Sequence, residues 1–174
     1  PDNWMWGEAY NLPLDEMMQV VDHALANGYP LAWGTDVSEK GFSRTKALGI
    51  IPEADLDGMS GTEAERWGKL TEREKEAALY KFDKPGKERT ITQQMRQEAF
   101  DNYETTDDHG MVIVGTATDQ IGNPYYKVLN SWDAMPPYGG YYYFSRPFVE
   151  YKTTDIMVNK RALPKAIAAK LGLK

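Results

Sequence analysis

Two neighbouring stretches decide the fold of this chain: residues 110–118 read GMVIVGTAT and residues 124–132 read PYYKVLNSW. Both are rich in β-branched and aromatic residues and are bounded by turn-forming residues, as strands are. Residues 119–123 (DQIGN) join them and include a glycine. The sequence therefore predicts an antiparallel β hairpin with a longer loop.

His109 and Asn130 fall on one face of this hairpin if the hairpin is symmetric about residues 118–123. Met111 then lies opposite Asn130, and His109 lies opposite Trp132. Because side chains alternate along a strand, all four share one face, and His109 and Asn130 become diagonal neighbours within reach of each other. A slip of one residue would place them on opposite faces.

An imidazole beside a carboxamide has a known catalytic use. The carboxamide oxygen accepts from one ring N–H and holds the ring, while the other ring nitrogen faces a nucleophile. An uncharged orienting group suits a thiolate–imidazolium pair, since cysteine needs less activation than serine. Trp132 is predicted to cover the His109–Asn130 bond from water. From the residues alone, a structural histidine and a turn-forming asparagine remain the competing interpretation.

Outward from the hairpin, the sequence predicts helices first and strands afterwards. A helix is expected at 14–27, a buried strand at 29–36 and a loop at 37–61. A charged helical stretch follows from a capping box at Thr62 and Glu65 to about Phe82, and another helix from a cap at Thr90 and Gln93 to about Tyr103. Further strands are expected at 141–145 and 152–158. The predicted class is α+β in a single domain, 1–174, with a helical and loop segment at 1–105, an antiparallel sheet at 109–158 with flanking helices, and a C-terminal helix at 162–171.

Composition narrows the function classes. The chain is 41% hydrophobic and 26% charged, which is typical of a globular protein. The net charge of −6 gives no electrostatic reason to expect nucleic-acid binding, and no apolar run is long enough to span a membrane. There is no cysteine, so these residues hold no thiol nucleophile. The chain opens at Pro1, and the apolar group Trp4, Met5 and Trp6 is interpreted as the continuation of an upstream segment.

The segment Asp108-His109-Gly110-Met111, a β hairpin, and then Leu129-Asn130-Ser131-Trp132 together resemble the second half of papain-like cysteine peptidases, and more narrowly the bleomycin hydrolase/aminopeptidase C branch. The predicted helix at 14–27 and strand at 29–37 resemble the segment that precedes the histidine in that branch. This resemblance implies a papain-like C-terminal half in which His109 is the general base, Asn130 the orienting amide and Trp132 the covering indole. The nucleophilic cysteine would lie on an N-terminal half that is absent from these residues.

The resemblance also implies an activity and partners. The complete protein is expected to be a cysteine-type peptidase, an aminopeptidase of the bleomycin hydrolase type, while this fragment alone is expected to be inactive. Its partners would be peptide substrates, the Cys-bearing half and further copies of itself in a homo-oligomer. No metal, cofactor, nucleic acid or membrane is implied, and the compartment is left open. Two departures concern Asp133, where the family usually has glycine, and the ending Leu171-Gly172-Leu173-Lys174, which does not resemble the tail that lies in the cleft of that branch.

Two other functions stay open from the sequence. One is a non-catalytic homologue that acts as a peptide-binding or scaffolding module. The other is a metal-dependent hydrolase that uses Asp107, Asp108 and His109, although a solvated turn is the preferred interpretation of the two aspartates. The remaining candidates are given structural roles: His23 in a helix, Asp55 and Asp57 in a loop without EF-hand spacing, and an aromatic cluster whose alternate members fill the core (Tyr138, Tyr141, Tyr142, Tyr143, Phe144).

Overall fold

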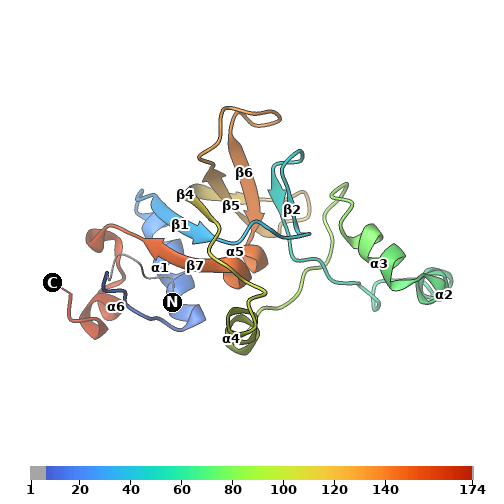
Figure 1. Ribbon diagram of the computed structural model, residues 1–174, viewed down its shortest axis with the longest axis horizontal. Coiled ribbons are helices and arrows are strands. Elements are labelled where there is room, and N and C mark those ends of the chain that lie inside the picture. The colour runs from blue at the N-terminus through green and yellow to red at the C-terminus, as the bar shows by residue number, and fades with distance from the viewer. Residues whose placement is uncertain (1–6, 174) are drawn as a thin grey trace.

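Seven strands form one sheet in the part of the chain that the structure describes, residues 7–173. This computed structural model orders them β2-β3-β6-β5-β4-β1-β7 (Figure 1). Neighbouring strands run antiparallel, except β3 and β6, which run parallel. The strands are β1 Leu31–Thr35, β2 Phe42–Ser43, β3 Leu48–Gly49, β4 His109–Thr118, β5 Pro124–Leu129, β6 Tyr141–Ser145 and β7 Thr153–Met157. The apolar group at residues 4–6 lies outside the described residues.

The helices take different positions around this sheet. Helices α2 and α3 stand away from it at one end of the molecule, whereas α1 lies near β1 and β7 at the other end (Figure 1). We call α2 and α3 together the arm. The helices are α1 Leu14–Ala26, α2 Gly61–Lys69, α3 Glu72–Leu79, α4 Gln93–Asp101, α5 Arg146–Lys152 and α6 Lys165–Lys170, with a 3-10 helix at Lys160–Ala162. Within the described residues, no helix is long and apolar enough to cross a membrane.

One face of the sheet carries the hydrophobic core. Side chains alternate along a strand, so every second residue of β1, β4, β5 and β6 points to this face. Helices α1 and α5 cover it with their own apolar residues, and Trp33 packs edge-on against Phe144 with ring centroids 4.9 Å apart. The indole N–H of Trp33 donates to Thr153 Oγ1 at 2.8 Å, so this buried polar atom is satisfied. The buried residues of this face include Leu31, Trp33, Met111, Ile113, Tyr126, Val128, Tyr142 and Phe144.

The α+β class is confirmed, and the strand expected at 29–36 is present as β1. The expectation of a loop throughout residues 37–61 was wrong. Strands β2 and β3 lie in this segment, and β3 joins β6 in parallel, so the sheet is not purely antiparallel and extends before residue 109. Each of these strands has only two residues, too few for an alternating pattern to be visible in the sequence.

Helix boundaries also differ from the expectation, because the capping residues differ. Helix α2 begins after Ser60, whose side chain accepts from the backbone of Glu63, and not at Thr62. A second capping box at Thr71 starts a new helix, α3, where one continuous helix was expected. Thr92 caps α4 in place of Thr90. The C-terminal helix expected at 162–171 begins only at Lys165, because Leu163, the residue before Pro164, is held extended.

Candidate active site

The pairing of β4 with β5 changes register once along the hairpin. Near the loop, Thr118 lies opposite Pro124, whereas near the open end Val112 lies opposite Leu129. The shift occurs at Val114, which stands outside the regular pairing as the extra residue of a β-bulge. The register expected from the sequence is therefore correct at the open end and displaced by one residue at the loop.

This bulge decides which side chains meet. Without it, the register of the loop end would continue to the open end, and His109 and Asn130 would fall on opposite faces of the sheet. With it, they share the face of the hydrophobic core. On its other side, β4 pairs with β1 so that His109 lies opposite Thr35, which is completely buried. His109 is thus fixed at the edge of the core, between the ends of two paired strands.

His109 and Asn130 are joined by a hydrogen bond. His109 Nε2 lies 2.9 Å from Asn130 Oδ1. The same Oδ1 accepts from the backbone N–H of Trp132 at 3.2 Å. A peptide N–H can only donate, so this second contact identifies the amide oxygen and requires that Nε2–H is the donor toward it. The neutral imidazole then carries its lone pair on Nδ1, and no hydrogen bond from within residues 7–173 occupies that nitrogen.

Asn130 is held from several directions. It is 5% exposed, and its backbone N–H donates to the carbonyl of Gly140 at 3.1 Å. Gly140 has a φ of 88°, in the left-handed region that favours glycine, and so allows the loop 131–140 to return to Asn130. Within the described residues, the buried Asn130 Nδ2 has no hydrogen-bond partner. The backbone contacts therefore aim the oxygen, not the nitrogen, at the imidazole.

Trp132 covers the imidazole. The centroids of the His109 and Trp132 rings are 4.7 Å apart, with their planes inclined by 36°. Phe42 and Tyr142 contact the indole edge-on, at 6.1 and 6.0 Å between centroids. The guanidinium carbon of Arg44 lies 4.7 Å from the indole centroid. The indole thus lies against one side of the His109 ring and is itself held by these neighbours.

Two aspartates clamp the strand ends that carry His109. Asp36 follows β1, and its carboxylate accepts from the backbone N–H of Thr106 at 2.8 Å. In return, Asp108 accepts from the backbone N–H of Val37 at 2.9 Å and of Ser38 at 3.2 Å. Burial acts to raise the pKa of Asp108, but these hydrogen bonds outweigh it and hold that pKa below its ordinary value. Asp108 is exposed, as expected of a solvated turn, but its carboxylate also accepts from two backbone N–H groups, which the sequence did not predict.

A buried lysine supports the same region. Lys152 is 3% exposed, and its ammonium donates to the carbonyl of Glu104 and to Thr105 Oγ1, both at 3.0 Å, while it pairs with the carboxylate of Glu39. The Lys152 carbonyl accepts from Thr35 Oγ1 at 2.9 Å. The segment before His109 and the end of β1 are thus tied to the end of α5. The burial of Lys152 could not be predicted from the sequence, because its partners are distant in the chain.

Replacing Asp108 with asparagine tests the clamp. An amide keeps one acceptor but loses the charge and the second acceptor, so the free energy of unfolding at neutral pH should fall by about 1–2 kcal/mol. The folded pKa of Asp108 lies below its ordinary value of 3.8, so its stabilisation is present above that value and is lost as the pH falls through the folded pKa. Urea denaturation at a series of pH values measures this. The two proteins should converge in acid, and a difference that persists unchanged there would contradict the clamp.

The other candidate residues lie apart from this site. The Nδ1 of His23 is 2.8 Å from the carbonyl of Ala162, so this ring holds α1 to the 3-10 helix. Asp107 accepts from Thr154 Oγ1 at 2.9 Å. In the aromatic cluster, Tyr142 and Phe144 are buried and Tyr138 is 49% exposed, as the alternating interpretation expects. Among the described residues, no group of three or more His, Cys, Asp or Glu side chains is placed to hold a metal ion.

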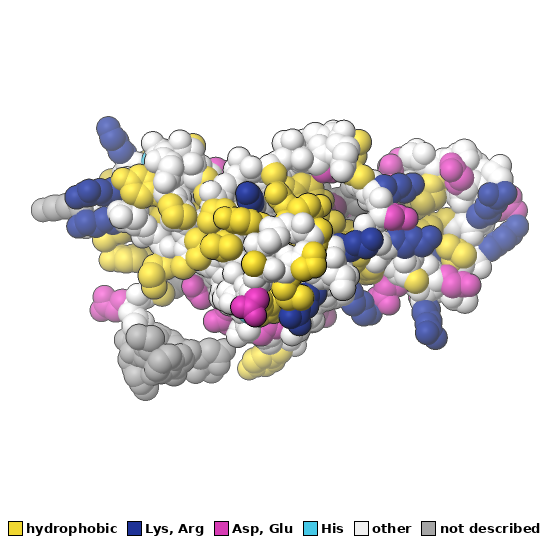
Figure 2. Space-filling model, turned by 90° about the horizontal axis from the view of Figure 1, so that it is seen from above, with side chains coloured by type: hydrophobic (Ala, Val, Ile, Leu, Met, Phe, Trp, Pro, Cys, Tyr) yellow, Lys and Arg dark blue, Asp and Glu magenta, His cyan; other side chains and the backbone are white. Residues whose placement is uncertain are grey.

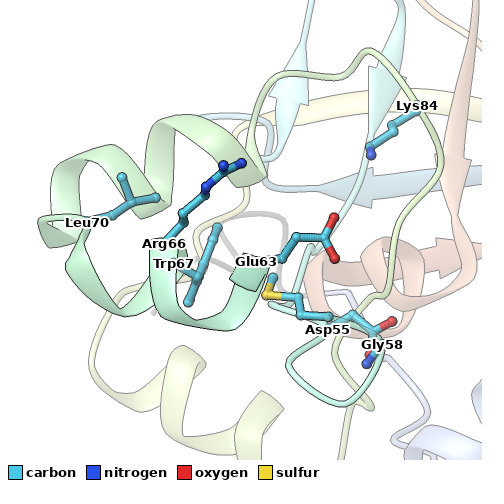
Figure 3. Close-up of a pocket in the computed structure, with 8 residues that line it drawn as sticks. Asp55, Gly58, Glu63, Arg66, Trp67, Leu70 and Lys84 are labelled. Atoms are coloured by element: carbon cyan, nitrogen blue, oxygen red, sulfur yellow. The ribbon is translucent and has the colours of Figure 1, made fainter. Parts of the chain in front are cut away.

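Two cavities lie on the arm side of the molecule, and neither includes His109, Asn130 or Trp132. The smaller, of about 420 Å³, is shown in Figure 3, where Arg66 and Trp67 project from α2 and Lys84 comes from a separate segment. Asp55 lies here, and its carboxylate accepts from the backbone N–H of Gly58 at 3.2 Å, as in a loop turn. The larger, of about 810 Å³, lies between the arm and the sheet and is lined in part by Tyr125 and Tyr143.

Comparisons with known proteins identify a family and a similar fold. A family model described as the peptidase C1-like family matches residues 60–173, which include His109, Asn130 and Trp132. Among solved structures, PepW from Lactobacillus rhamnosis HN001 is similar, with a TM-score of 0.59 and 20% sequence identity. The similarity covers 93% of this chain and 30% of the PepW chain, so this chain spans less than a third of that protein. No curated protein matches the chain.

Proposed function

Because this chain belongs to the peptidase C1-like family, we propose that it carries the base-and-orienter part of a Cys–His–Asn site that hydrolyses peptide bonds. The resemblance to papain-like peptidases is confirmed by the family match and by the fold. We propose the roles of the single residues, His109 as the base and Asn130 as the group that orients it. The proposal is carried by one observation, the hydrogen bond that joins His109 Nε2 to Asn130 Oδ1 and leaves Nδ1 as the basic nitrogen.

In the proposed mechanism, the nucleophile is a cysteine outside these residues, since the chain has no cysteine. His109 Nδ1 takes the thiol proton, and the resulting thiolate attacks the scissile carbonyl. The imidazolium then gives the proton to the leaving amine, and the acyl-enzyme forms. Water, deprotonated by His109, attacks the acyl carbon, the C–S bond breaks to release the acid, and the proton on His109 returns to the sulfur. Asn130 holds the ring through both steps, and Trp132 limits the access of water to the His109–Asn130 bond.

The complete protein is proposed to contain a Cys-bearing half that packs against this one. Figure 2 shows hydrophobic side chains gathered along the middle of one face, between the charged side chains of the arm and those at the opposite end. Exposed apolar side chains of the sheet and its loops include Val114, Leu129 and Tyr138. Apolar surface of this kind favours contact with further protein. Aminopeptidase specificity and homo-oligomerisation are further parts of the proposal, and they rest on the resemblance to the bleomycin hydrolase branch.

Active-site labelling tests the proposed function. A peptide with a thiol-reactive group at the position of the scissile bond should modify one cysteine of the complete protein, and mass spectrometry should locate it outside residues 1–174. A short competing peptide should slow the labelling. If the complete protein has no cysteine that reacts, or if labelling is indifferent to the peptide, the peptidase assignment fails and a peptide-binding module becomes the better description.

Replacing Asn130 with alanine should weaken turnover without abolishing it. His109 keeps its basic nitrogen, but the ring loses the acceptor that fixes its orientation. We expect kcat/KM for peptide hydrolysis to fall by about a hundredfold, the loss that follows from misplacing a catalytic group by roughly 1 Å. Steady-state kinetics of the complete protein measures this loss. A loss smaller than about threefold would show that Asn130 does not orient the base.

A further inference from the structure

Arg44 is held beside the proposed site by contacts of both its backbone and its guanidinium group. It lies in the turn between β2 and β3, and its carbonyl oxygen accepts from the Tyr142 hydroxyl at 3.5 Å. The guanidinium lies over the indole of Trp132, 4.7 Å from its centroid, and one N–H of Nη2 points to the sulfur of Met135 at 3.3 Å. The head group of this exposed residue thus has a defined position over the indole that covers His109.

The charge of Arg44 has no carboxylate partner within residues 7–173. Among the described residues, seven lysines and arginines do pair with a carboxylate, Lys40, Lys69, Lys75, Lys87, Arg146, Lys152 and Lys170. Stacking on an indole occupies the face of a guanidinium, and one weak contact to sulfur uses one of its five N–H groups. The remaining N–H groups lie in the plane of the guanidinium. A guanidinium binds a carboxylate in this plane, through two parallel hydrogen bonds.

The distance to the proposed base fits a substrate contact. Trp132 is the common neighbour, since its centroid is 4.7 Å from the His109 ring and 4.7 Å from the Arg44 guanidinium carbon. Arg44 is therefore no farther from the imidazole than about three residues of extended peptide. In the proposed reaction His109 delivers its proton to the leaving amine, so the residues that follow the scissile bond must approach the His109 side of the site.

We propose that Arg44 is a specificity-determining residue that binds a carboxylate on the leaving-group side of the scissile bond. This inference rests on the proposed peptidase function and adds a substrate class to it. The carboxylate has two chemical sources: an acidic side chain in the first residues after the scissile bond, or the free C-terminus of a short leaving group. Both present the same planar, charged acceptor to the guanidinium.

Matched peptide pairs with the complete protein separate these sources. One pair differs by Glu or Gln at the first position after the scissile bond, with an amidated C-terminus. The other has a neutral side chain and ends in a free acid or an amide. We expect kcat/KM to favour the carboxylate of at least one pair by about tenfold, the factor that one charge-assisted contact supplies. The pair that shows the preference identifies the source.

Substitutions of Arg44 should change the ratio of kcat/KM between the carboxylate peptide and its neutral partner. The size of the change should follow the charge of the new side chain. Arg44→Ala should bring the ratio to about one, Arg44→Lys should keep part of it, and Arg44→Glu should invert it. The matched control is Arg73→Ala, because Arg73 is an exposed arginine on α3 in the arm. This control should keep the wild-type ratio.

The outcomes are distinct. A wild-type ratio near one for both pairs, or a preference that survives in both Arg44→Ala and Arg44→Glu, would overturn the assignment of Arg44 and leave the peptidase function standing. If the complete protein hydrolyses none of the four peptides and reacts with no thiol-directed analogue, the proposed function fails and this inference fails with it.

Discussion

Replacing His109 with alanine should abolish the acylation of the complete protein by peptide substrates. The substitution removes the group that takes the thiol proton and returns it to the leaving amine, a contribution of about 100- to 10,000-fold for one proton-transferring group. We expect the upper part of this range in kcat/KM, since His109 acts twice during acylation, first taking the thiol proton and then giving it to the leaving amine. The acylation rate in a single turnover, followed by release of a chromogenic leaving group, measures the effect.

The matched control for this experiment is His23→Gln. His23 is the other of the two histidines in the chain, and its ring bonds only to the Ala162 carbonyl in the described residues. Glutamine keeps a side-chain N–H, so turnover should stay near the wild-type level. Unchanged acylation in the His109 variant, or equal losses in both variants, would contradict the role of His109.

Replacing Lys152 with alanine should destabilise the chain more than any other charged-residue change described above. The ammonium is buried, and its removal leaves the Glu39 carboxylate, the Glu104 carbonyl and Thr105 Oγ1 without their shared donor. Breaking a buried ion pair by removing one partner costs about 3–5 kcal/mol of the free energy of unfolding. Glu39 is partly exposed, which places the expected loss near the lower end. Urea denaturation measures it.

The pH dependence of that loss provides a further check. Burial raises the pKa of Glu39 above its ordinary value of 4.5 even with Lys152 present. In the Lys152→Ala variant the remaining carboxylate lacks its cation, so its charged form is disfavoured further in the folded state. A raised acid pKa lowers stability above the folded pKa and is relieved as the pH falls toward 4.5. The loss should therefore shrink in mild acid.

The matched control is Lys165→Ala, at an exposed position of α6. It should change the free energy of unfolding by less than about 0.5 kcal/mol.

The meeting of His109 with Asn130 was predictable because it depends on a strong local pattern. Two strand-like runs flank a short loop, and alternation then fixes which residues share a face. The bulge at Val114 was not predictable, since nothing in the run of β-branched residues distinguishes the unpaired position. The sequence-based register was correct at the site although it placed the loop pairing one residue away from its position in the structure.

The contacts that hold the segments around His109 could not be predicted from a sequence pattern. Asp36, Asp108 and Lys152 are drawn together from three distant segments, and each alone resembles an ordinary surface charge in the sequence. Arg44 lies in a short hairpin whose strands of two residues carry no periodicity. These contacts depend on tertiary packing. The identity of a residue in the sequence does not show which distant residues it will contact.

In the complete protein, His109 Nδ1 should face a cysteine sulfur while Nε2 is held by Asn130. A crystal structure of the complete protein measures this directly. We expect a cysteine Sγ within hydrogen-bond reach of Nδ1, about 3–4 Å, with the Nε2–Oδ1 contact retained. A structure in which Nδ1 faces no cysteine, or in which His109 and Asn130 are separated, would contradict it.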